Sequence, residues 1–288
     1  MMNKRALTTV LATALTFSHA VSAQDFDSVE VTVHEVEGNV RYLEGAGGNI
    51  GLLTGDDGVF LIDDQYAPLT DKIVAAIRTV SDEPIRFVIN THLHPDHTGG
   101  NENFGRMGAV IVGHDNVRRQ MEISGYDETP PFVTFSEDMS FYLNGEKVYV
   151  FKIPDAHTNG DSFIRFENAN VIHTGDTFRT TGYPYIDTNN GGTFLGTIRA
   201  HDLLIDISDV NTKILPGHGV VTDVNEVRET RDMLLTIRDR VQSAINEGMS
   251  VEDAQAAGLT ADFDPQYRPA GNFGTPEQLI AAAYADLQ

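Results

Sequence analysis

The sequence predicts a single α/β domain, because short β-rich runs and amphipathic helical stretches alternate along the 288 residues. Two observations carry this prediction. The chain opens with apolar runs separated by turns rich in glycine and aspartate, which predict an antiparallel meander; these runs cover 29–36, 40–43, 50–54 and 59–62. Strands and helices then arrive in two successive sets, and periodicity alone specifies no more than the α/β class.

The elements after the meander follow from local patterns. Helical periodicity over 69–80, with Pro68 near its start and Asp71 in its first turn, predicts a helix. Strands are expected at 85–89, 109–112, 141–143, 148–153, 162–166, 171–173 and 213–215. Further helices are expected from about residue 100, at 114–121, 198–207 and 223–246, and on both sides of an irregular stretch at 263–274. Residues 126–137 and 181–193 are expected to be loops, the first of them a possible lid.

The N-terminal residues have the pattern of a secretory signal peptide. Lys4 and Arg5 precede a mostly apolar stretch at 6–17 that is too short to span a bilayer, and a small-x-small cleavage site ends at Ala23. We therefore expect cleavage after Ala23, one domain over 24–288, and a periplasmic or secreted protein. A retained membrane anchor is the alternative.

The amino-acid composition limits the classes of molecule that the protein is expected to bind. The formal net charge is −22, which disfavours nucleic acid and anionic membranes, so a small-molecule substrate is expected. The chain contains no cysteine, and an exported form would therefore have neither disulfides nor a thiolate nucleophile. The oligomeric state is not indicated.

A dense cluster of metal-binding residue types follows one predicted strand: His92, His94, Asp96 and His97. In an extended chain, residues two apart face the same side, so His92, His94 and Asp96 should converge, whereas His97 can face elsewhere. Pro95 should prevent helical continuation through the cluster. Imidazole and carboxylate ligands together favour zinc, iron or manganese over calcium or magnesium.

This His-x-His-x-Asp-His pattern resembles the signature of the metallo-β-lactamase fold superfamily of hydrolases. The later ligands of that family can be sought in order, and they occur at His157 in PDAHTNGDS, Asp176 in HTGDT and His218 in LPGHG. The resemblance extends from the first strands to His218. It implies a four-layer αββα sandwich, with the ligands in loops at strand ends.

The resemblance also implies a role for each ligand. His92, His94 and His157 would hold a first metal, Asp96, His97 and His218 a second, and Asp176 would bridge the two. Two zinc ions per chain are expected, with iron or manganese possible, because seven ligands exceed the needs of one tetrahedral zinc. Water held by two cations loses its proton near neutral pH and becomes a nucleophile, which Asp96 would help to orient.

The bridging position distinguishes this chain from many true β-lactamases. Asp176 stands where those enzymes commonly carry a cysteine or a further histidine, and this resembles glyoxalase II, lactonases and related esterases. We expect hydrolysis of a lactone, ester or thioester, and at most weak hydrolysis of a β-lactam. Two alternatives stay open: an iron-dependent dioxygenase of the persulfide type, and a non-catalytic periplasmic binding protein that retains the metal cleft.

Other residues are weaker candidates. Tyr183 and Tyr185 are candidates for an oxyanion donor, although both could simply pack within their loop. Arg179 could pair with a substrate carboxylate, but a surface arginine is the simpler interpretation. His173 could orient a ligand or be purely structural. Three further histidines, His34, His114 and His201, lack a metal-binding context.

Overall fold

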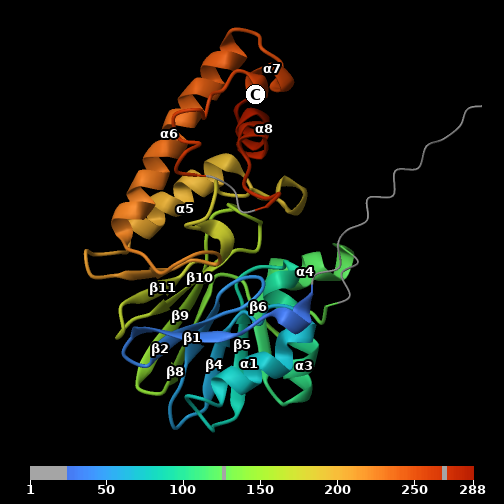
Figure 1. Ribbon diagram of the computed structural model, residues 1–288, viewed down its shortest axis with the longest axis vertical. Coiled ribbons are helices and arrows are strands. Elements are labelled where there is room, and N and C mark those ends of the chain that lie inside the picture. The colour runs from blue at the N-terminus through green and yellow to red at the C-terminus, as the bar shows by residue number, and fades with distance from the viewer. Residues whose placement is uncertain (1–24, 125–127, 268–270) are drawn as a thin grey trace, which may run out of the picture.

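The computed structural model describes residues 25–124, 128–267 and 271–288. The expected signal peptide lies outside these described residues. Two sheets face each other in the lower part of the molecule, and helices α5 to α8 form an upper part (Figure 1). Within the described ranges, no helix combines the length and apolar character that crossing a membrane requires.

The first sheet has seven strands in the order in which they occur along the chain. They are β1 (Thr32–Glu37), β2 (Val40–Glu44), β3 (Ile50–Leu53), β4 (Val59–Ile62), β5 (Ile85–Asn90), β6 (Val110–His114) and β7 (Val133–Phe135). The first four are antiparallel neighbours, as the predicted meander requires, and β4 to β7 are parallel. Parallel pairing places the carboxyl ends of β4, β5 and β6 at one edge.

The second sheet has five strands in the order β12-β11-β10-β9-β8. They are β8 (Asp138–Leu143), β9 (Glu146–Lys152), β10 (Ser162–Phe166), β11 (Val171–His173) and β12 (Lys213–Leu215). Only the β11–β12 pair is parallel. The loops that follow β11 and β12 therefore also leave from one edge of their sheet.

Helices cover the outer faces of both sheets. The described α-helices are α1 (Thr70–Ile77), α2 (Pro95–Thr98), α3 (Asn101–Arg106), α4 (Asp115–Ser124), α5 (Phe194–Asp206), α6 (Val224–Asn246), α7 (Val251–Ala256) and α8 (Pro276–Leu287). Of these, α7 and α8 pack with α5 and α6 in a separate helical cluster rather than on a sheet. Helix α1 packs on the first sheet through Ile73 and Ile77. Helices α5 and α6 pack on the second sheet through residues such as Leu204 and Val227.

The main core lies between the two sheets. Phe60, Ile62 and Ile89 from the first sheet pack against Val150 and other residues of the second, and all of these side chains are buried. With helices outside each sheet, the order of layers is helix, sheet, sheet, helix. The four-layer αββα architecture that the family resemblance implies is confirmed.

Three local expectations differ from the structure. The expected loop 126–137 contains the short strand β7, which pairs with β6. Pro95 does not interrupt a helix but occupies the first position of α2, where proline needs no amide hydrogen. Helix α5 begins at Phe194 rather than at 198, because the side chain of Thr193 caps it by accepting from the amide of Gly196.

Candidate metal centre

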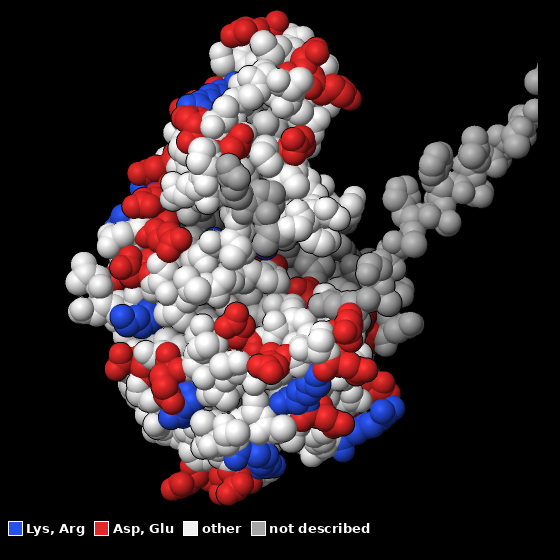
Figure 2. Space-filling view, viewed as in Figure 1, with Lys and Arg blue, Asp and Glu red and all other residues white. Residues whose placement is uncertain are grey.

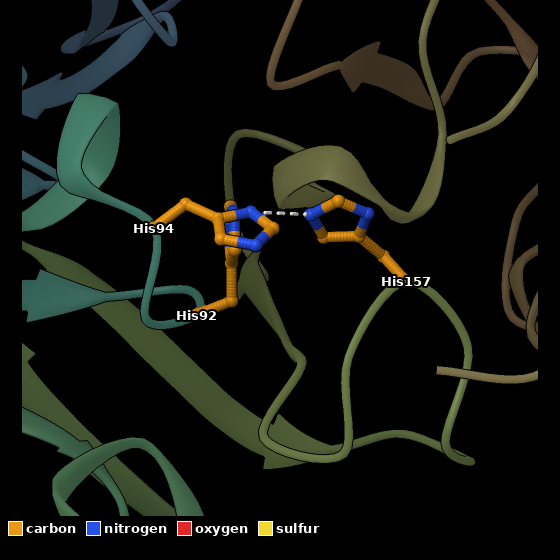
Figure 3. Close-up of side chains that lie close together, drawn as sticks. All are labelled: His92, His94 and His157. Atoms are coloured by element: carbon orange, nitrogen blue, oxygen red, sulfur yellow. Dashed lines mark hydrogen bonds between the residues drawn. The ribbon is translucent and has the colours of Figure 1, made fainter. Parts of the chain in front are cut away.

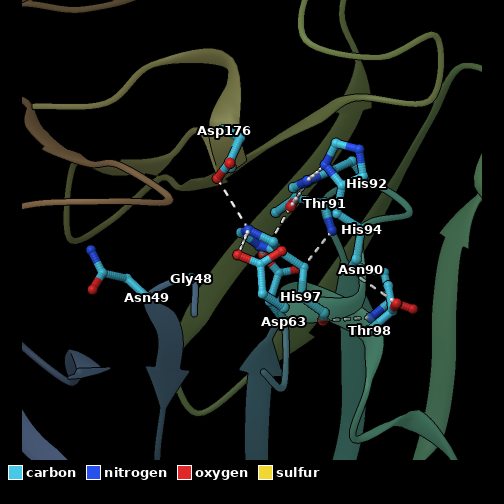
Figure 4. Close-up of polar contacts among 12 residues, drawn as sticks. Gly48, Asn49, Asp63, Asn90, Thr91, His92, His94, His97, Thr98 and Asp176 are labelled. Atoms are coloured by element: carbon cyan, nitrogen blue, oxygen red, sulfur yellow. Dashed lines mark hydrogen bonds and ion pairs between the residues drawn. The ribbon is translucent and has the colours of Figure 1, made fainter. Parts of the chain in front are cut away.

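The seven candidate ligands come from four loops at the edge where the parallel strands end. The loop after β5 supplies His92, His94, Asp96 and His97, the β9–β10 loop supplies His157, and the loops after β11 and β12 supply Asp176 and His218. The structure brings all of them together, and Figure 4 shows part of this arrangement. Asp96 and His97 reach the site from α2, whose single turn directs both side chains toward it.

A first group consists of His92, His94 and His157, whose rings converge in Figure 3. Nδ1 of His94 lies 3.0 Å from Nε2 of His92 and 2.9 Å from Nε2 of His157. Two nitrogens bound to one tetrahedral zinc at about 2.05 Å would lie about 3.3 Å apart. The observed spacing is therefore close to that of a coordination triangle.

A second group consists of Asp96, His97, His218 and Asp176. Nε2 of His97 lies 3.1 Å from Oδ1 of Asp176 and 3.6 Å from Oδ2 of Asp96. Nε2 of His218 lies 3.1 Å from Oδ2 of Asp176 and 3.3 Å from Oδ2 of Asp96. Asp176 also approaches the first group, with Oδ2 3.9 Å from Nε2 of His157. The carboxylate of Asp176 thus lies between the two groups.

The ligand rings are oriented by partners on their far sides. Nε2 of His94 lies 2.8 Å from Oδ2 of Asp187, and Nδ1 of His157 lies 2.7 Å from the carbonyl oxygen of Tyr185. Such contacts fix the tautomer of a metal-binding histidine and direct its other nitrogen toward the ion. No local sequence pattern indicates the role of Asp63, whose Oδ2 lies 2.7 Å from Nδ1 of His97, or that of Asp187.

Burial keeps His92 and His157 of the first group neutral. It lowers the pKa of His92 well below the usual value, and the neighbouring His97, His157 and His94 lower it further. Burial, followed by the proximity of His94, lowers the pKa of His157 to about 3. Neutral imidazole is the form that binds a metal, so these two rings are ready to do so.

The second group is dominated by attraction between histidine and carboxylate. Burial would lower the pKa of His97, but Asp176, Asp96 and Asp63 outweigh burial and raise it well above the usual value. The pKa of His218 is raised to about 9, because Asp176 and Asp96 again outweigh burial. In the absence of metal these two rings are protonated at neutral pH. Their positive charges then partly balance the carboxylates, as bound metal ions would.

The donor set fits metal ions. Nε2 of His97 and Oδ1 of Asp176 are buried and face each other at 3.1 Å as an ion pair, but neither atom makes a hydrogen bond of good geometry. Buried polar atoms without such a bond are costly unless a ligand satisfies them. Imidazole and carboxylate donors in these numbers suit zinc, iron or manganese.

The β2–β3 hairpin loop closes one side of the centre. Its backbone contacts two of the ligand loops: the amide of Gly48 donates to the carbonyl of Asp96, and the amide of Asn49 donates to the carbonyl of Gly217. A side chain at Gly48 would place Cβ only 2.2 Å from the ring of His97. Glycine is therefore required where this loop passes the ligand.

A cavity of about 880 Å³ opens beside the ligands, within the size range of small-molecule sites. Asp96, Asp176 and His218 line it together with Arg179 and Tyr185. The interpretation of Arg179 as a surface residue is wrong, because this residue is only 8% exposed. Its Nε atom has no hydrogen-bond partner, and no carboxylate among the described residues lies within ion-pair distance of its guanidinium.

The two candidate tyrosines have different surroundings. Tyr185 lines the cavity, and its ring centroid lies 5.7 Å from that of His157. Tyr183 is fully buried, stacks on Tyr267 and donates its hydroxyl to Asp264 at 2.7 Å. The expectation of a substrate-facing Tyr183 is therefore corrected, because its hydroxyl is committed to a contact away from the cavity.

The other four histidines in the part of the chain that the structure describes bond to residues outside the two groups. His173 accepts from the amide of Gly175 and contacts the carbonyl of Asn49, so it supports two loops of the site without approaching the ligand groups. His114 and His201 contact nearby carbonyl oxygens, and His34 lies beside Glu44. All four have partners that account for their positions.

The family model described as the metallo-beta-lactamase superfamily matches residues 43–221, a segment that contains every candidate ligand. The chain belongs to the metallo-β-lactamase superfamily. Among curated members, a linear primary-alkylsulfatase from Pseudomonas sp. (strain ATCC 19151) is 21% identical over 81% of this chain and 54% of its own length. A hydroxyacylglutathione hydrolase from Pelagibacter ubique is 28% identical over 46% of this chain and 52% of its own length. The chain thus spans about half the length of the curated relatives it matches.

Solved structures of this superfamily share the fold. The sec-alkylsulfatase Pisa1 from Pseudomonas sp. superposes with a TM-score of 0.73 at 13% identity, over 89% of this chain and 50% of that one. The DIM-1 metallo-β-lactamase superposes with a TM-score of 0.63 at 16% identity, over 72% of this chain and 99% of that one. At these identities the likeness establishes the fold alone.

Proposed function

We propose that this chain is a metal-dependent hydrolase that holds two metal ions and cleaves an ester-type bond in a small molecule. The observation that carries the proposal is the position of Asp176, whose carboxylate lies 3.1 Å from both His97 and His218 and 3.9 Å from His157. A carboxylate so placed is suited to bridge two ions.

The proposed assignment of ligands follows the two groups. His92, His94 and His157 would hold the first ion, Asp96, His97 and His218 the second, and Asp176 would contact both. We propose zinc for both ions, with iron or manganese as alternatives. When bound, such ions would lower the pKa of water to near neutrality and polarise the bond that is cleaved.

The chain itself supplies groups that bind and orient the substrate. Asp96 is a ligand that also lines the cavity, so its carboxylate is placed to accept and return a proton during hydrolysis. Arg179 lines the same cavity; its guanidinium donates from Nη2 to the hydroxyl of Thr181 at 3.5 Å, but it has no carboxylate partner among the described residues. A buried cation without a counter-charge favours a substrate that carries an anionic group.

Carboxylic esters, lactones and thioesters are the first substrates proposed. Alkyl sulfates are a second class, supported by the similarity to an alkylsulfatase over 81% of the chain and by the anionic character of such esters. A bridging carboxylate makes the metal pair less electrophilic, so we propose weak activity at most toward β-lactams. We also propose that the protein is exported, from the N-terminal sequence pattern.

A panel assay tests this function. Zinc-loaded protein would be offered an aryl ester, a lactone, a thioester, an alkyl sulfate and a cephalosporin, each with and without a chelator. Turnover of one class that disappears with chelator and returns with zinc supports the proposal. Oxygen consumption on a persulfide with one bound iron would instead indicate the dioxygenase, and metal binding without any turnover would indicate a binding protein.

A further inference from the structure

One short segment contacts two ligands of the first group from behind. Tyr185, Ile186 and Asp187, which we call the strap, lie between Phe178 and α5. The carbonyl of Tyr185 accepts from Nδ1 of His157, and the carboxylate of Asp187 accepts from Nε2 of His94. The amide of Asp187 also donates to the carbonyl of His157 at 2.9 Å.

The carboxylate of Asp187 is itself firmly placed. Its side chain is only 8% exposed, and it accepts hydrogen bonds from the backbone amides of Asn189 and Asn190 and from the side-chain amide of Asn190. An ionised carboxylate can only accept, so His94 must carry its proton on Nε2.

That tautomer has a consequence for the centre. With the proton on Nε2, the lone pair of His94 is on Nδ1, the atom that faces Nε2 of His92 and Nε2 of His157. His92 and His157 direct Nε2 toward the centre and so need their proton on Nδ1. His94 is the one member of the group that needs its proton on Nε2. Asp187 therefore selects the form of His94 that can bind a metal.

The strap is anchored to the C-terminal helices. Ile186 is buried in the cluster formed by α5, α6, α7 and α8. Two residues before the strap, Tyr183 donates its hydroxyl to Asp264 and its amide to the carbonyl of Gly274. Gly274 approaches so closely that a Cβ there would lie 2.2 Å from the carbonyl oxygen of Tyr183.

We propose that Asp187 is a positioning residue for the first metal and that the connection between α7 and α8 holds it in place through Tyr183. This inference deepens the proposed function and rests on it for the metal, but the tautomer of His94 can be measured without any metal. The connection between α7 and α8 then has a role in the chemistry although it supplies no ligand.

The first readout is the nitrogen NMR spectrum of the histidine rings in chelator-treated protein at about pH 8. We expect the Nε2–H form of His94 in the wild type and its loss in Asp187→Asn, whose side-chain amide can donate to Nε2. Persistence of the Nε2–H form in Asp187→Asn would overturn the inference. This readout does not depend on whether the protein is a hydrolase.

The second readout is metal affinity, measured by competition with a chromophoric chelator. Asp187→Asn is expected to lower the affinity for the first metal by about 10- to 100-fold and the affinity for the second by less than about threefold. Asp187→Glu should recover part of the loss if its longer carboxylate reaches His94. Equal weakening of both metals together with a lowered melting temperature would indicate a merely structural role and overturn the inference.

Tyr183→Phe tests the anchor, with Tyr284→Phe as its matched control. Tyr284 lies in α8 and donates its hydroxyl to the carbonyl of Met249, so its loss removes one hydrogen bond from the same layer without touching the strap. We expect the affinity for the first metal to fall by about threefold or more in Tyr183→Phe and to stay unchanged in Tyr284→Phe. The same effect in both variants would contradict the anchoring role, and a wild type that binds no metal would contradict the proposed function instead.

Discussion

Oδ2 of Asp63 lies 2.7 Å from Nδ1 of His97, and both side chains are fully buried. The same carboxylate accepts hydrogen bonds from the amide of Thr91 at 2.7 Å and from its hydroxyl at 2.8 Å. Asp63 thus joins the end of β4 to the loop after β5 while it orients a candidate ligand. Figure 4 shows it beneath the ring of His97.

Replacing Asp63 should destabilise the protein strongly. Asp63→Ala leaves His97 buried without this carboxylate and removes two acceptors from Thr91, so we expect a loss of about 3–5 kcal/mol in the free energy of unfolding. Urea unfolding of chelator-treated protein measures it. Asp232→Ala is the control, because Asp232 is exposed and pairs only at the surface with Arg231, and its effect should stay below about 1 kcal/mol. Similar losses in both variants would contradict this role of Asp63.

Metal binding should release protons. The raised pKa values of His97 and His218 mean that both rings are protonated at pH 7 without metal, and each must lose its proton to bind an ion. Metal affinity should therefore increase with pH from 7 toward about 9. Calorimetry in buffers of different ionisation enthalpy would count the protons, and we expect roughly two per chain. Release of none would contradict the protonation of His97 and His218 in the metal-free protein.

Gly48→Ala should disable the second metal site. The new Cβ would lie 2.2 Å from the ring of His97, and that ring cannot retreat because Asp63 and neighbouring groups enclose it. We expect a loss of metal from the second site and a fall in turnover of about 100-fold or more. Gly105→Ala is the control, since its Cβ would meet only the exposed side chain of Phe132 at 3.3 Å. Unchanged metal content in Gly48→Ala would contradict the close approach.

Arg179 should determine preference for anionic substrates. A matched pair of esters, 4-nitrophenyl acetate and mono-4-nitrophenyl succinate, differs by a distal carboxylate. Arg179→Gln should lower the ratio of kcat/KM for the succinate over the acetate by about tenfold or more, the worth of a charge-assisted hydrogen bond. Arg238→Gln removes a surface arginine that pairs with Asp239 and should leave the ratio unchanged. An unchanged ratio in Arg179→Gln would exclude this role.

Acidic residues gather over both the sheets and the helices in the face shown in Figure 2. Their negative charge repels anions at long range, so recognition of an anionic substrate must depend on local groups. Arg179, buried beside the candidate ligands, is such a group. This contrast between surface and cavity is the reason for testing substrate charge directly.

Much of the fold and the convergence of the candidate ligands followed from sequence. The strand run 85–89 before His92 is apolar except for Arg86, and the candidate ligands farther along the chain occur in recognisable motifs, so local patterns sufficed. The prediction for Pro95 is wrong because proline disfavours a helix interior but suits a first turn, and only the fold decides between these positions.

The partners behind the ligands could not be found from local patterns. Asp187 is 93 residues from His94 and Asp63 is 34 residues from His97 along the chain, and neither stands in a spacing that indicates the contact. Tyr183 and Tyr185 are equally plausible by sequence, yet the packing of α8 and its preceding loop buries one and leaves the other at the cavity. Burial of Arg179 likewise depends on loops from distant parts of the chain.

The most direct test of the two-metal hydrolase is a titration of zinc into chelator-treated protein while ester hydrolysis is recorded. The proposed site requires turnover to rise until two equivalents per chain are bound and then to stay constant. A plateau at one equivalent, or turnover that is independent of metal, would contradict the central claim.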